Sequence, residues 1–489
     1  MVNRFLPIIY NLARLNILFS CLLWAPALAS YYFGDGLLET WLFTSLVMII
    51  SSFIIRQLTK KYNRELQARD GFLLAFLLWI LFAFAASIPI YFSDSLSFTD
   101  AYFEAISGLT TTGSSVFANV EHLQPSLNLW RHMLNWFGGM GIIVLAVAII
   151  PTLGIGGMNI LRAEITGVNK DKKLTPRIAQ TAKSLWGIYI IFTVIVVIVL
   201  KLAGMSWFDA VCHAFSSISL GGFSTYSDSI GHFNSVTIEI ILMITMLIGA
   251  ISFLNHIMVI KNRSLIIYWK DEEVRIFLKV LLLSILISTV YLWYMGFYGQ
   301  GLSGFLTSLR YVAFNYVSIG TACGFSSVDF TQWPIYVGII MYMLANILSN
   351  SGSTGGGIKM IRIIIQFKFM YREMLLLIHP NAVKTVKVNG NIVPNKISLN
   401  VMAFILVYLM TVVIATLILL FTGVDAVSAF SFIIASITNA GPGLGYLGPM
   451  ADLNILSDFQ KWVCAFTMLI GRLEIFTVFI LFLPVYWES

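Results

Sequence analysis

The polar stretch Thr110-Thr111-Thr112-Gly113 lies between an apolar segment too short to span a bilayer and a longer one. Three consecutive threonines disfavour a helix because branching at Cβ restricts their rotamers, and glycine permits backbone angles that other residues avoid. Non-helical backbone is tolerated at membrane depth only where protein buries it or where it lines a water-filled cavity. Its carbonyl oxygens can then replace the hydration shell of a cation. The chemistry predicted here is the coordination of an ion by backbone oxygens.

Turns of this kind occur four times, each after a short apolar half-helix and each ending on a glycine. The closing glycines are Gly113, Gly222, Gly324 and Gly441, at intervals of 109, 102 and 117 residues. Ordinary loop turns would explain one such match, but four in the same order indicate a repeated unit of span, re-entrant loop and span around one pore. The residues predicted to form its selectivity filter are Thr110, Thr111, Thr112, Gly113, Ser219, Leu220, Gly221, Gly222, Thr321, Ala322, Cys323, Gly324, Thr438, Asn439, Ala440 and Gly441.

The composition places these turns in a membrane protein. Of the 489 residues, 58% are hydrophobic and only 11% are charged, whereas soluble domains carry about 25% charged residues. Many apolar runs of about 20 residues predict an all-α polytopic membrane protein. The net charge of +7 then indicates basic loops on one side of a membrane rather than a nucleic-acid partner. Four cysteines without a CxxC motif indicate neither a disulfide framework nor a zinc site.

The chain divides into an N-terminal part and four pseudo-symmetric span–pore-loop–span repeats. Two extra spans and a basic loop occupy residues 1–70. The repeats cover residues 71–180, 181–272, 273–396 and 397–489, with half-helices predicted at 103–109, 208–218, 305–318 and 424–437. An Asp-Ala pair near the start of three half-helices suits a helix N-terminus. Ala27-Leu28-Ala29 resembles a signal-peptidase site, but apolar residues continue beyond it, so we expect a retained first helix.

Loop charge predicts how the chain lies in the membrane. The segments that hold the four turns are acidic, and Arg310 is their only clear basic residue. Basic residues gather instead in segments 60–69, 162–183, 261–279 and 359–396. Because basic loops tend to remain in the cytoplasm, the turns are expected to face outside and both termini to be cytoplasmic. An acidic outer mouth would raise the local concentration of cations.

A second non-helical stretch interrupts the apolar run 337–369 in the third repeat. Four of its six residues 352–357 are glycines, and each weakens a helix by about 1 kcal/mol relative to alanine, so the stretch is predicted to line the pore as a gate. A phosphate-binding loop would need Gly-Lys-Ser/Thr, but Ile358 separates Gly357 from Lys359. A glycine-rich seam for helix packing remains an alternative. The gate residues are Asn346, Ser349, Asn350, Gly352, Ser353, Thr354, Gly355, Gly356 and Gly357.

Arg472 lies inside the last apolar run, where a charge costs about 3 kcal/mol or more. One interpretation is an internal salt bridge to Glu474 or to another span. Glu474 is a poor partner because residues two apart do not share a helix face. The other interpretation places Arg472 below the filter, as a positive barrier that also contacts the gate.

Four half-helix-and-glycine turns between paired spans resemble the Trk/Ktr/HKT family of cation transporters. Potassium channels themselves use a TVGYG filter, which this chain lacks. The two extra N-terminal spans and the length resemble the TrkH branch of the family. In some plant members a serine at the first closing position accompanies sodium selectivity, so glycine at all four positions implies a preference for potassium. The resemblance also gives residues 346–357 and Arg472 the role of an intramembrane gate.

The resemblance implies partners as well as a fold. It predicts a homodimer in the bacterial inner membrane and a cytoplasmic, nucleotide-binding regulatory ring of the TrkA type, controlled by ATP/ADP or NAD(H). No covalently bound cofactor is expected, and the nucleotide would bind only to the partner subunit. The basic stretches 162–183 and 359–396 could dock this ring or could hold anionic membrane lipid.

The predicted function is potassium uptake through a channel-like pore, with hydroxyls of Thr110, Thr321 and Thr438 assisting at its inner end. The alternative is a secondary transporter that couples potassium to sodium or protons. Such a transporter needs intramembrane carboxylates, for which Glu104, Glu164 and Glu474 are the evident candidates. A membrane enzyme would need clustered catalytic His, Asp or Cys residues at membrane depth. His132, His213 and His256 are scattered instead, so no enzyme is predicted.

Overall fold

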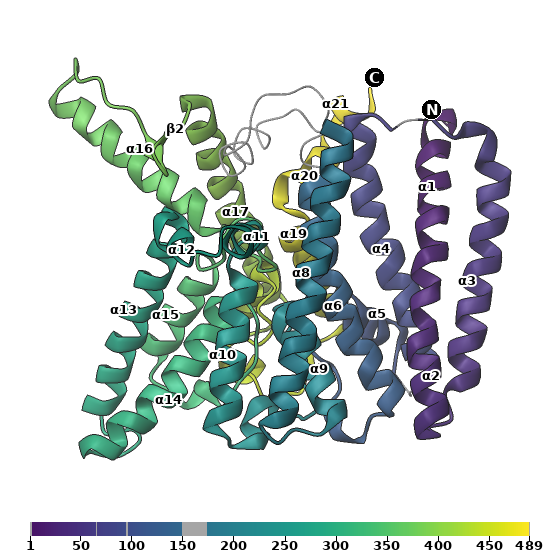
Figure 1. The fold of residues 1–489 in the computed structure, drawn as a ribbon, viewed down its shortest axis with the longest axis horizontal. Helices are drawn as coiled ribbons and strands as arrows, with labels where there is room; N and C mark the ends of the chain where they lie inside the picture. Colours follow the sequence, from purple (N-terminus) through teal and green to yellow (C-terminus); the bar gives the residue numbers. More distant parts are fainter. Residues whose placement is uncertain (1, 65, 94–95, 149–173, 489) are drawn as a thin grey trace.

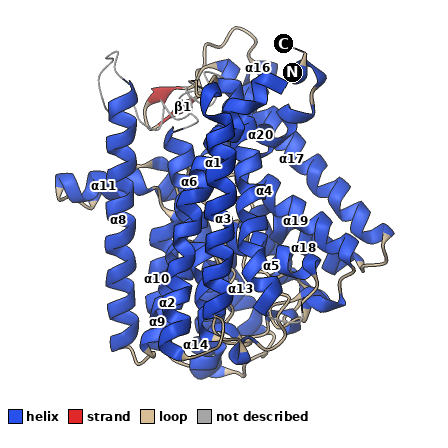
Figure 2. Ribbon diagram, turned by 90° about the vertical axis from the view of Figure 1, so that its right-hand side faces the viewer, coloured by secondary structure: helices blue, strands red, loops and turns tan. Residues whose placement is uncertain are grey.

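The computed structural model describes residues 2–64, 66–93, 96–148 and 174–488. Within them the protein is mostly helical, with most long helices running in a common direction (Figures 1 and 2). Six described helices are long and apolar enough to cross a membrane, and two bent helix pairs would raise this number to eight. The predicted all-α polytopic class is confirmed. Among described residues, the only sheet is the hairpin of β1 (Lys387–Val388) and β2 (Asn391–Ile392).

Three N-terminal helices form a unit at one side of the molecule (Figure 1). They are α1 (Val2–Ser20), α2 (Trp24–Phe33) and α3 (Leu38–Thr59), and they pack against the first repeat. In the turn between α2 and α3, Asp35 Oδ2 accepts a hydrogen bond of 2.9 Å from the backbone N–H of Ser126. The extra spans therefore cap the helix that follows the first filter turn.

Each repeat contains a long helix, a shorter half-helix and a second span. The first has α4 (Ala68–Ser93), α5 (Phe98–Leu109) and α6 (Pro125–Ala148). The second has α8 (Leu174–Leu202), α9 (Trp207–Ile218), α10 (Val236–Ala250) and α11 (Phe253–Asn262), followed by α12 (Ile266–Lys270). The third has α13 (Glu272–Tyr294), α14 (Gly301–Gly320), α15 (Ile335–Ala345) and α16 (Met360–Ile378). The fourth has α17 (Asn395–Phe421), α18 (Ala426–Thr438), α19 (Asp458–Leu473) and α20 (Ile475–Phe479), followed by α21 (Pro484–Trp487).

The four half-helices α5, α9, α14 and α18 are arranged in a closed ring. The second span of each repeat packs against the half-helix of the next: α6 on α9, α10 on α14, α15 on α18, and α19 back on α5. This order brings segments more than 300 residues apart into contact and leaves the ends of the half-helices together at the centre.

The half-helices begin earlier than predicted in the first three repeats, and capping explains where two of them begin. Ser97 and Ser206 accept hydrogen bonds from the backbone N–H groups of Asp100 and Asp209, so these aspartates lie in the first turn. In the fourth repeat Asp425 is itself the N-cap. Both arrangements satisfy backbone N–H donors, and both place a negative carboxylate at the positive end of the helix dipole.

The second span is broken in three repeats, whereas the sequence predicted a break only in the third. The axes of α10 and α11 differ by 98° across Ile251-Ser252, and a bend of 110° separates α19 from α20 at Glu474. Neither break contains the glycine run that marks the third, so local composition gave no signal. The first repeat continues beyond α6 into residues 149–173, outside the described residues.

Candidate functional site

Each half-helix ends in the same hydrogen-bonded turn, at the first residues of the predicted filter. In the first repeat Thr112 N donates to Ser107 O (2.8 Å) and Thr111 N to Gly108 O (3.0 Å). This is a Schellman ending, in which the residue after the helix takes a left-handed conformation. The residues in that conformation are Thr111 (φ 57°), Leu220 (56°), Ala322 (61°) and Asn439 (58°).

None of these four residues is glycine, although glycine is the usual choice because a Cβ atom costs roughly 1–2 kcal/mol in this conformation. Strained backbone of this kind occurs at functional sites, where the surrounding structure imposes it. Its recurrence at equivalent positions confirms that the four turns are copies of one structural unit.

The closing glycines pack against one another around a ring. Their φ values are also positive, between 69° and 100°. A Cβ atom added to any of them would lie less than 3.0 Å from a carbonyl oxygen of the next turn, closer than real Cβ atoms approach other atoms. The pairs are Gly113 with Gly221 O, Gly222 with Cys323 O, Gly324 with Ala440 O, and Gly441 with Thr112 O. The structure therefore brings all sixteen predicted filter residues together.

The carbonyl oxygens of these turns are free of backbone partners. No backbone N–H group in the described residues donates to any of the sixteen. The hydroxyls of Thr110, Thr321 and Thr438 donate to the carbonyl four residues earlier in their own helices, at 2.7 Å. This bond fixes each hydroxyl while leaving its oxygen able to accept or to coordinate.

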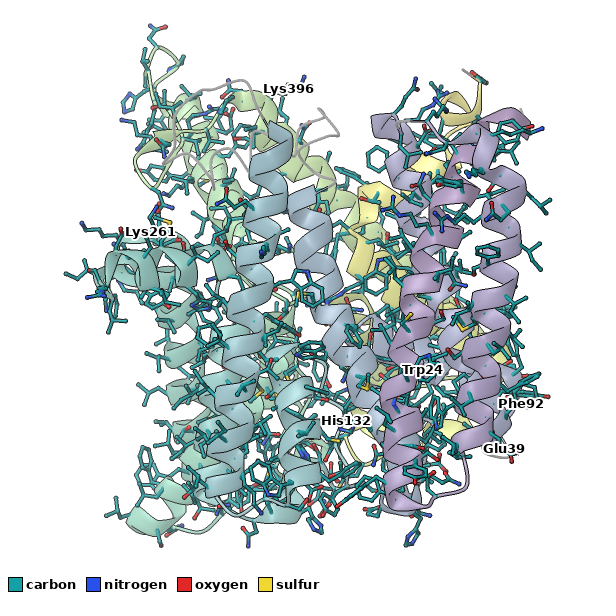
Figure 3. All side chains as sticks on the ribbon, turned by 45° about the vertical axis from the view of Figure 1, so that its right-hand side comes forward. Trp24, Glu39, Phe92, His132, Lys261 and Lys396 are labelled. Carbon is teal, nitrogen blue, oxygen red and sulfur yellow. The ribbon has the colours of Figure 1, made fainter. Side chains whose placement is uncertain are left out.

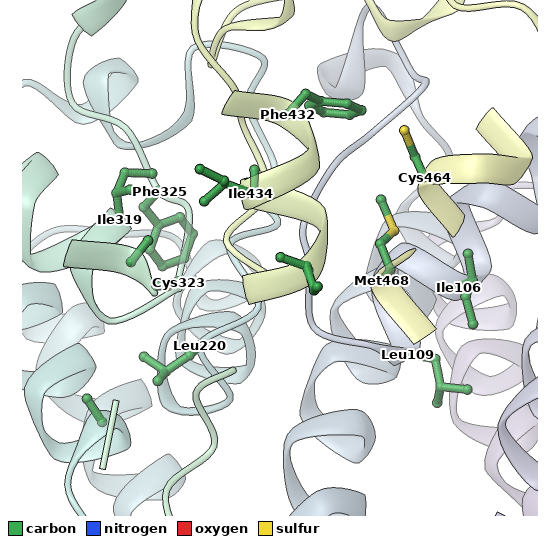
Figure 4. Packing of buried hydrophobic residues seen from close by; sticks show 14 of the residues in the cluster. Ile106, Leu109, Leu220, Ile319, Cys323, Phe325, Phe432, Ile434, Cys464 and Met468 are labelled. Atoms are coloured by element: carbon green, nitrogen blue, oxygen red, sulfur yellow. The ribbon is translucent and has the colours of Figure 1, made fainter. Parts of the chain in front are cut away.

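Two of the side chains that differ between the turns, Leu220 and Cys323, face the protein core. Leu220 and Cys323 are fully buried, and Figure 4 shows them within an apolar cluster that also contains Ile319 and Ile434. Their variation between repeats is therefore compatible with a constant backbone, because the varying atoms pack away from the ring.

A cavity of about 140 Å³ opens on one side of the ring. All four closing glycines line it, together with the backbone and small side chains that follow each turn. A charged side chain, Arg131 of α6, also lines this cavity.

The segment that links α15 to α16, residues 346–359, is held by backbone hydrogen bonds. At its neck Ile358 N donates to Asn346 O (2.8 Å) and Met360 N to Ser349 O (2.9 Å). Its tip binds the break after α10, because Asn350 N donates to Ala250 O (3.1 Å). We call this segment the 346–359 loop.

The 346–359 loop lies directly against the inner ends of the filter turns. A Cβ atom on Gly356 would lie under 3.0 Å from Thr438 O, and one on Gly355 would lie 3.2 Å from Thr321 O. Thr354 Oγ1 donates to Ile218 O (3.3 Å), just before the second turn. Glycines are therefore required where the loop meets the ring, and this contact explains their presence better than a helix-packing seam does.

Arg472 joins the loop to the first repeat. Its guanidinium donates to Thr354 O (2.7 Å) and to Gly138 O in α6 (2.9 Å). The residue is only 2% exposed, and its Nε has no hydrogen-bonding partner in the described part of the chain. Its partners are carbonyl groups, so an internal salt bridge to Glu474 is not what holds it.

Glu474 instead pairs with the last residue of the 346–359 loop and with the helix α16 that follows it. Its carboxylate lies 2.8 Å from Arg362 and 3.5 Å from Lys359. Lys359 (φ 74°) and Glu474 (φ 63°) both have left-handed backbone conformations, so the pair connects two helix breaks. The sequence offered no indication of this pairing, because 115 residues separate the two positions.

Three carboxylates of the half-helices and second spans also form ion pairs. Glu104 pairs with Arg131, Glu239 with Arg310, and Asp100 with Lys461. Arg310 is therefore not the only basic residue there, and Arg131 could have been noted as a charge inside an apolar span. Glu121 accepts hydrogen bonds from Ser227 N and Oγ; although burial alone would raise its pKa, these bonds hold the pKa below its usual value.

The three histidines noted in the sequence do not form a metal site in the described residues. His132 and His213 are buried behind the first two turns, while His256 lies in α11. No group of three or more His, Cys, Asp or Glu side chains in the described residues could hold a metal ion. Glu164 and most of the basic stretch 162–183 fall outside the described residues.

A fold of re-entrant half-helices around a ring of carbonyl oxygens defines a membrane transporter for cations. The family described as "TrkH: Cation transport protein" matches residues 41–489, and the chain belongs to it. The predicted resemblance and the expectation of a transporter rather than an enzyme are both confirmed.

Close relatives cover nearly the whole chain. The Trk system potassium uptake proteins TrkH of Salmonella typhimurium and Halomonas elongata are each 41% identical, over 97% and 98% of this chain and 98% of their own lengths. The crystal structure of the potassium transporter TrkH from Vibrio parahaemolyticus superposes with a TM-score of 0.90 at 38% identity, over 99% of this chain and all of that one.

Proposed function

We propose that this protein takes up potassium through a channel-like pore whose selectivity filter is formed by the backbone carbonyls of the four turns. The observation that carries the proposal is the ring of closing glycines, each packed on a carbonyl of the next turn. Such a ring presents oxygen dipoles to a dehydrated cation. The names of the relatives, which are potassium uptake proteins, indicate potassium as the ion.

The 346–359 loop is proposed as the gate and Arg472 as its electrostatic part. The loop contacts the second, third and fourth turns, and Arg472 connects it to the first repeat. A loop in this position obstructs the path below the filter, and a guanidinium there repels cations.

The orientation follows from the distribution of charge. Both termini lie at one end of the molecule (Figure 1). Lys396 lies at this end and Lys261 in the same half of the molecule, whereas Glu39 lies toward the opposite end (Figure 3). Because basic loops tend to remain inside, we propose that both termini are cytoplasmic and that the filter cavity faces outward across a bacterial inner membrane.

Partners are proposed from the family resemblance. The relatives belong to a Trk system, a name that indicates assembly with further components. We propose a homodimer whose cytoplasmic face binds a TrkA-like regulatory subunit, with any ATP, ADP or NAD bound by that subunit. The cytoplasmic segment 359–396 could contact this subunit or anionic lipid.

The coupled-transporter alternative needs a free carboxylate along the path. Glu104 and Glu474 are both engaged in ion pairs, which leaves them poorly suited to bind and release a coupling ion. Of the candidates in the described residues, neither supports coupling, which favours a channel-like flux; Glu164 lies outside the described residues.

The test is the reversal potential of the purified protein in planar bilayers. With opposing gradients, current through a channel reverses at the potassium equilibrium potential and does not move when only the sodium or proton gradient is changed. A shift with either of those gradients would establish coupling instead.

Arg472→Ala is expected to raise the potassium flux severalfold, because it removes both a positive charge below the filter and a bond of the 346–359 loop. Arg472→Lys keeps the charge but not both carbonyl contacts, so it should lie between wild type and alanine. Tracer uptake into proteoliposomes measures all three. Equal flux in the three proteins, at equal incorporation, would show that Arg472 only stabilises the fold.

A further inference from the structure

We propose that the buried ion pair Arg131–Glu104 sets the electrostatic potential of the outer cavity and thereby the rate at which cations enter, because Glu104 cancels a positive charge that would otherwise repel them. The inference rests on the proposed function. It concerns residues on the opposite side of the filter from the gate, and it assigns a role to each member of the pair.

Glu104 is fully buried in the half-helix α5 and accepts three hydrogen bonds. They come from Arg131 Nε (2.6 Å), Ser115 Oγ (3.0 Å) and Val116 N (3.0 Å). Ser115 and Val116 follow the first closing glycine, so the carboxylate fixes the chain as it leaves the filter. A carboxylate without these donors would not remain buried.

The side chain of Arg131, in the first repeat, also contacts the second repeat. Its side chain is 1% exposed, and besides Glu104 it donates to Ser115 Oγ (3.0 Å) and Asn128 Oδ1 (2.9 Å). Its guanidinium lies 4.3 Å from the ring centroid of Phe223, the residue after Gly222. The arginine thus holds the outer ends of two neighbouring filter turns.

The position of Arg131 gives its charge a functional consequence. It lines the cavity that all four closing glycines share, so an uncompensated charge there would act on an ion at the filter mouth. Charges in clefts with low-dielectric walls change the local concentration of ions strongly. With Glu104 bound, the pair adds no net charge to the wall, and the carboxylate of Asp452 is left as the charged group that lines the cavity, while the arginine still supplies its hydrogen bonds.

In the second and third repeats the equivalent residues make a similar hydrogen bond without a carboxylate. Six residues before each filter turn stand Glu104, His213, Asn315 and Phe432. His213 Nε2 lies 2.9 Å from Ser224 Oγ, and Asn315 Nδ2 donates to Ser327 Oγ (3.0 Å). A bond from the half-helix to the chain beyond the filter therefore does not require charge. In the second repeat a carboxylate at another position, Asp209, also accepts a hydrogen bond from Thr225 Oγ1 (2.7 Å). Among the four equivalent positions only the first repeat has a carboxylate, and there it pairs with an arginine.

The two single neutralisations should change conductance in opposite directions. Arg131→Gln leaves a negative wall and is expected to raise inward potassium conductance at low ionic strength, on the order of two- to tenfold. Glu104→Gln leaves a positive wall and should lower it by a similar factor. The double variant should return toward wild type, and all differences should shrink at high salt because screening weakens them. Single-channel recording in planar bilayers measures each.

Controls separate charge from packing. Arg131→Lys keeps the charge and loses the forked hydrogen bonds, so it should remain near wild-type conductance if charge decides. The pair Arg310–Glu239, with a separation of 2.7 Å, does not line the cavity, and its neutralisations should leave conductance unchanged. If Arg131→Gln and Arg131→Lys both lower conductance, the pair is only structural and the proposal is wrong. If Glu104→Gln does not accumulate, the two arginine variants still decide. If the wild-type protein carried no potassium current at all, the proposed function itself would be contradicted.

Discussion

Deleting residues 350–357 is expected to raise the potassium flux of the purified protein, without any regulatory subunit, by about tenfold or more, the effect of lowering a barrier by roughly 1.4 kcal/mol. These residues form the part of the 346–359 loop that contacts the second, third and fourth filter turns. Their removal opens the space below the ring. Rubidium tracer uptake into proteoliposomes measures the flux.

The geometry of the neck makes this deletion feasible. Met360 N donates to Ser349 O and Ile358 N to Asn346 O, so the two ends to be joined already lie side by side. A control replaces residues 350–357 with eight glycine and serine residues, which keeps the length but not the Thr354 side-chain bond. The reversal potential should stay at that of potassium in both proteins. Unchanged flux through a normally incorporated deletion variant would show that the loop is not the gate.

Gly222→Ala is expected to reduce discrimination of potassium over sodium by about tenfold, the equivalent of roughly 1.4 kcal/mol of lost differential binding. The new methyl group would overlap the carbonyl oxygen of Cys323 in the next turn. That oxygen, one of those proposed to hold the ion, must move. Bi-ionic reversal potentials measure the change.

Gly423→Ala is the matched control for this substitution. Gly423 also has a positive φ of 94°, but no described heavy atom lies within 4 Å of the Cβ position. Both variants therefore place an alanine at a positive φ, a conformation that costs roughly 1–2 kcal/mol, and only Gly222→Ala disturbs a carbonyl. If the two variants retain equal selectivity, the closing glycines serve the backbone conformation alone.

The sequence by itself determined the class of the protein, the four repeats and the sixteen residues of the ring. Hydropathy indicates membrane spans because each residue contributes its own free energy of transfer from water to lipid. The glycine run 352–357 and the buried charge of Arg472 were also recognisable, because each is locally unfavourable to a membrane helix.

Only the tertiary structure decided how these parts meet. The left-handed residues Thr111, Leu220, Ala322 and Asn439 have no common side-chain type, because packing around the ring imposes their conformation rather than local preference. The breaks after α10 and α19 likewise depend on contacts with the 346–359 loop and with Lys359 and Arg362. The carbonyl partners of Arg472 and the pairing of Glu104 with Arg131 join residues far apart in the chain. Such contacts depend on the closure of the ring, which no local stretch of sequence encodes.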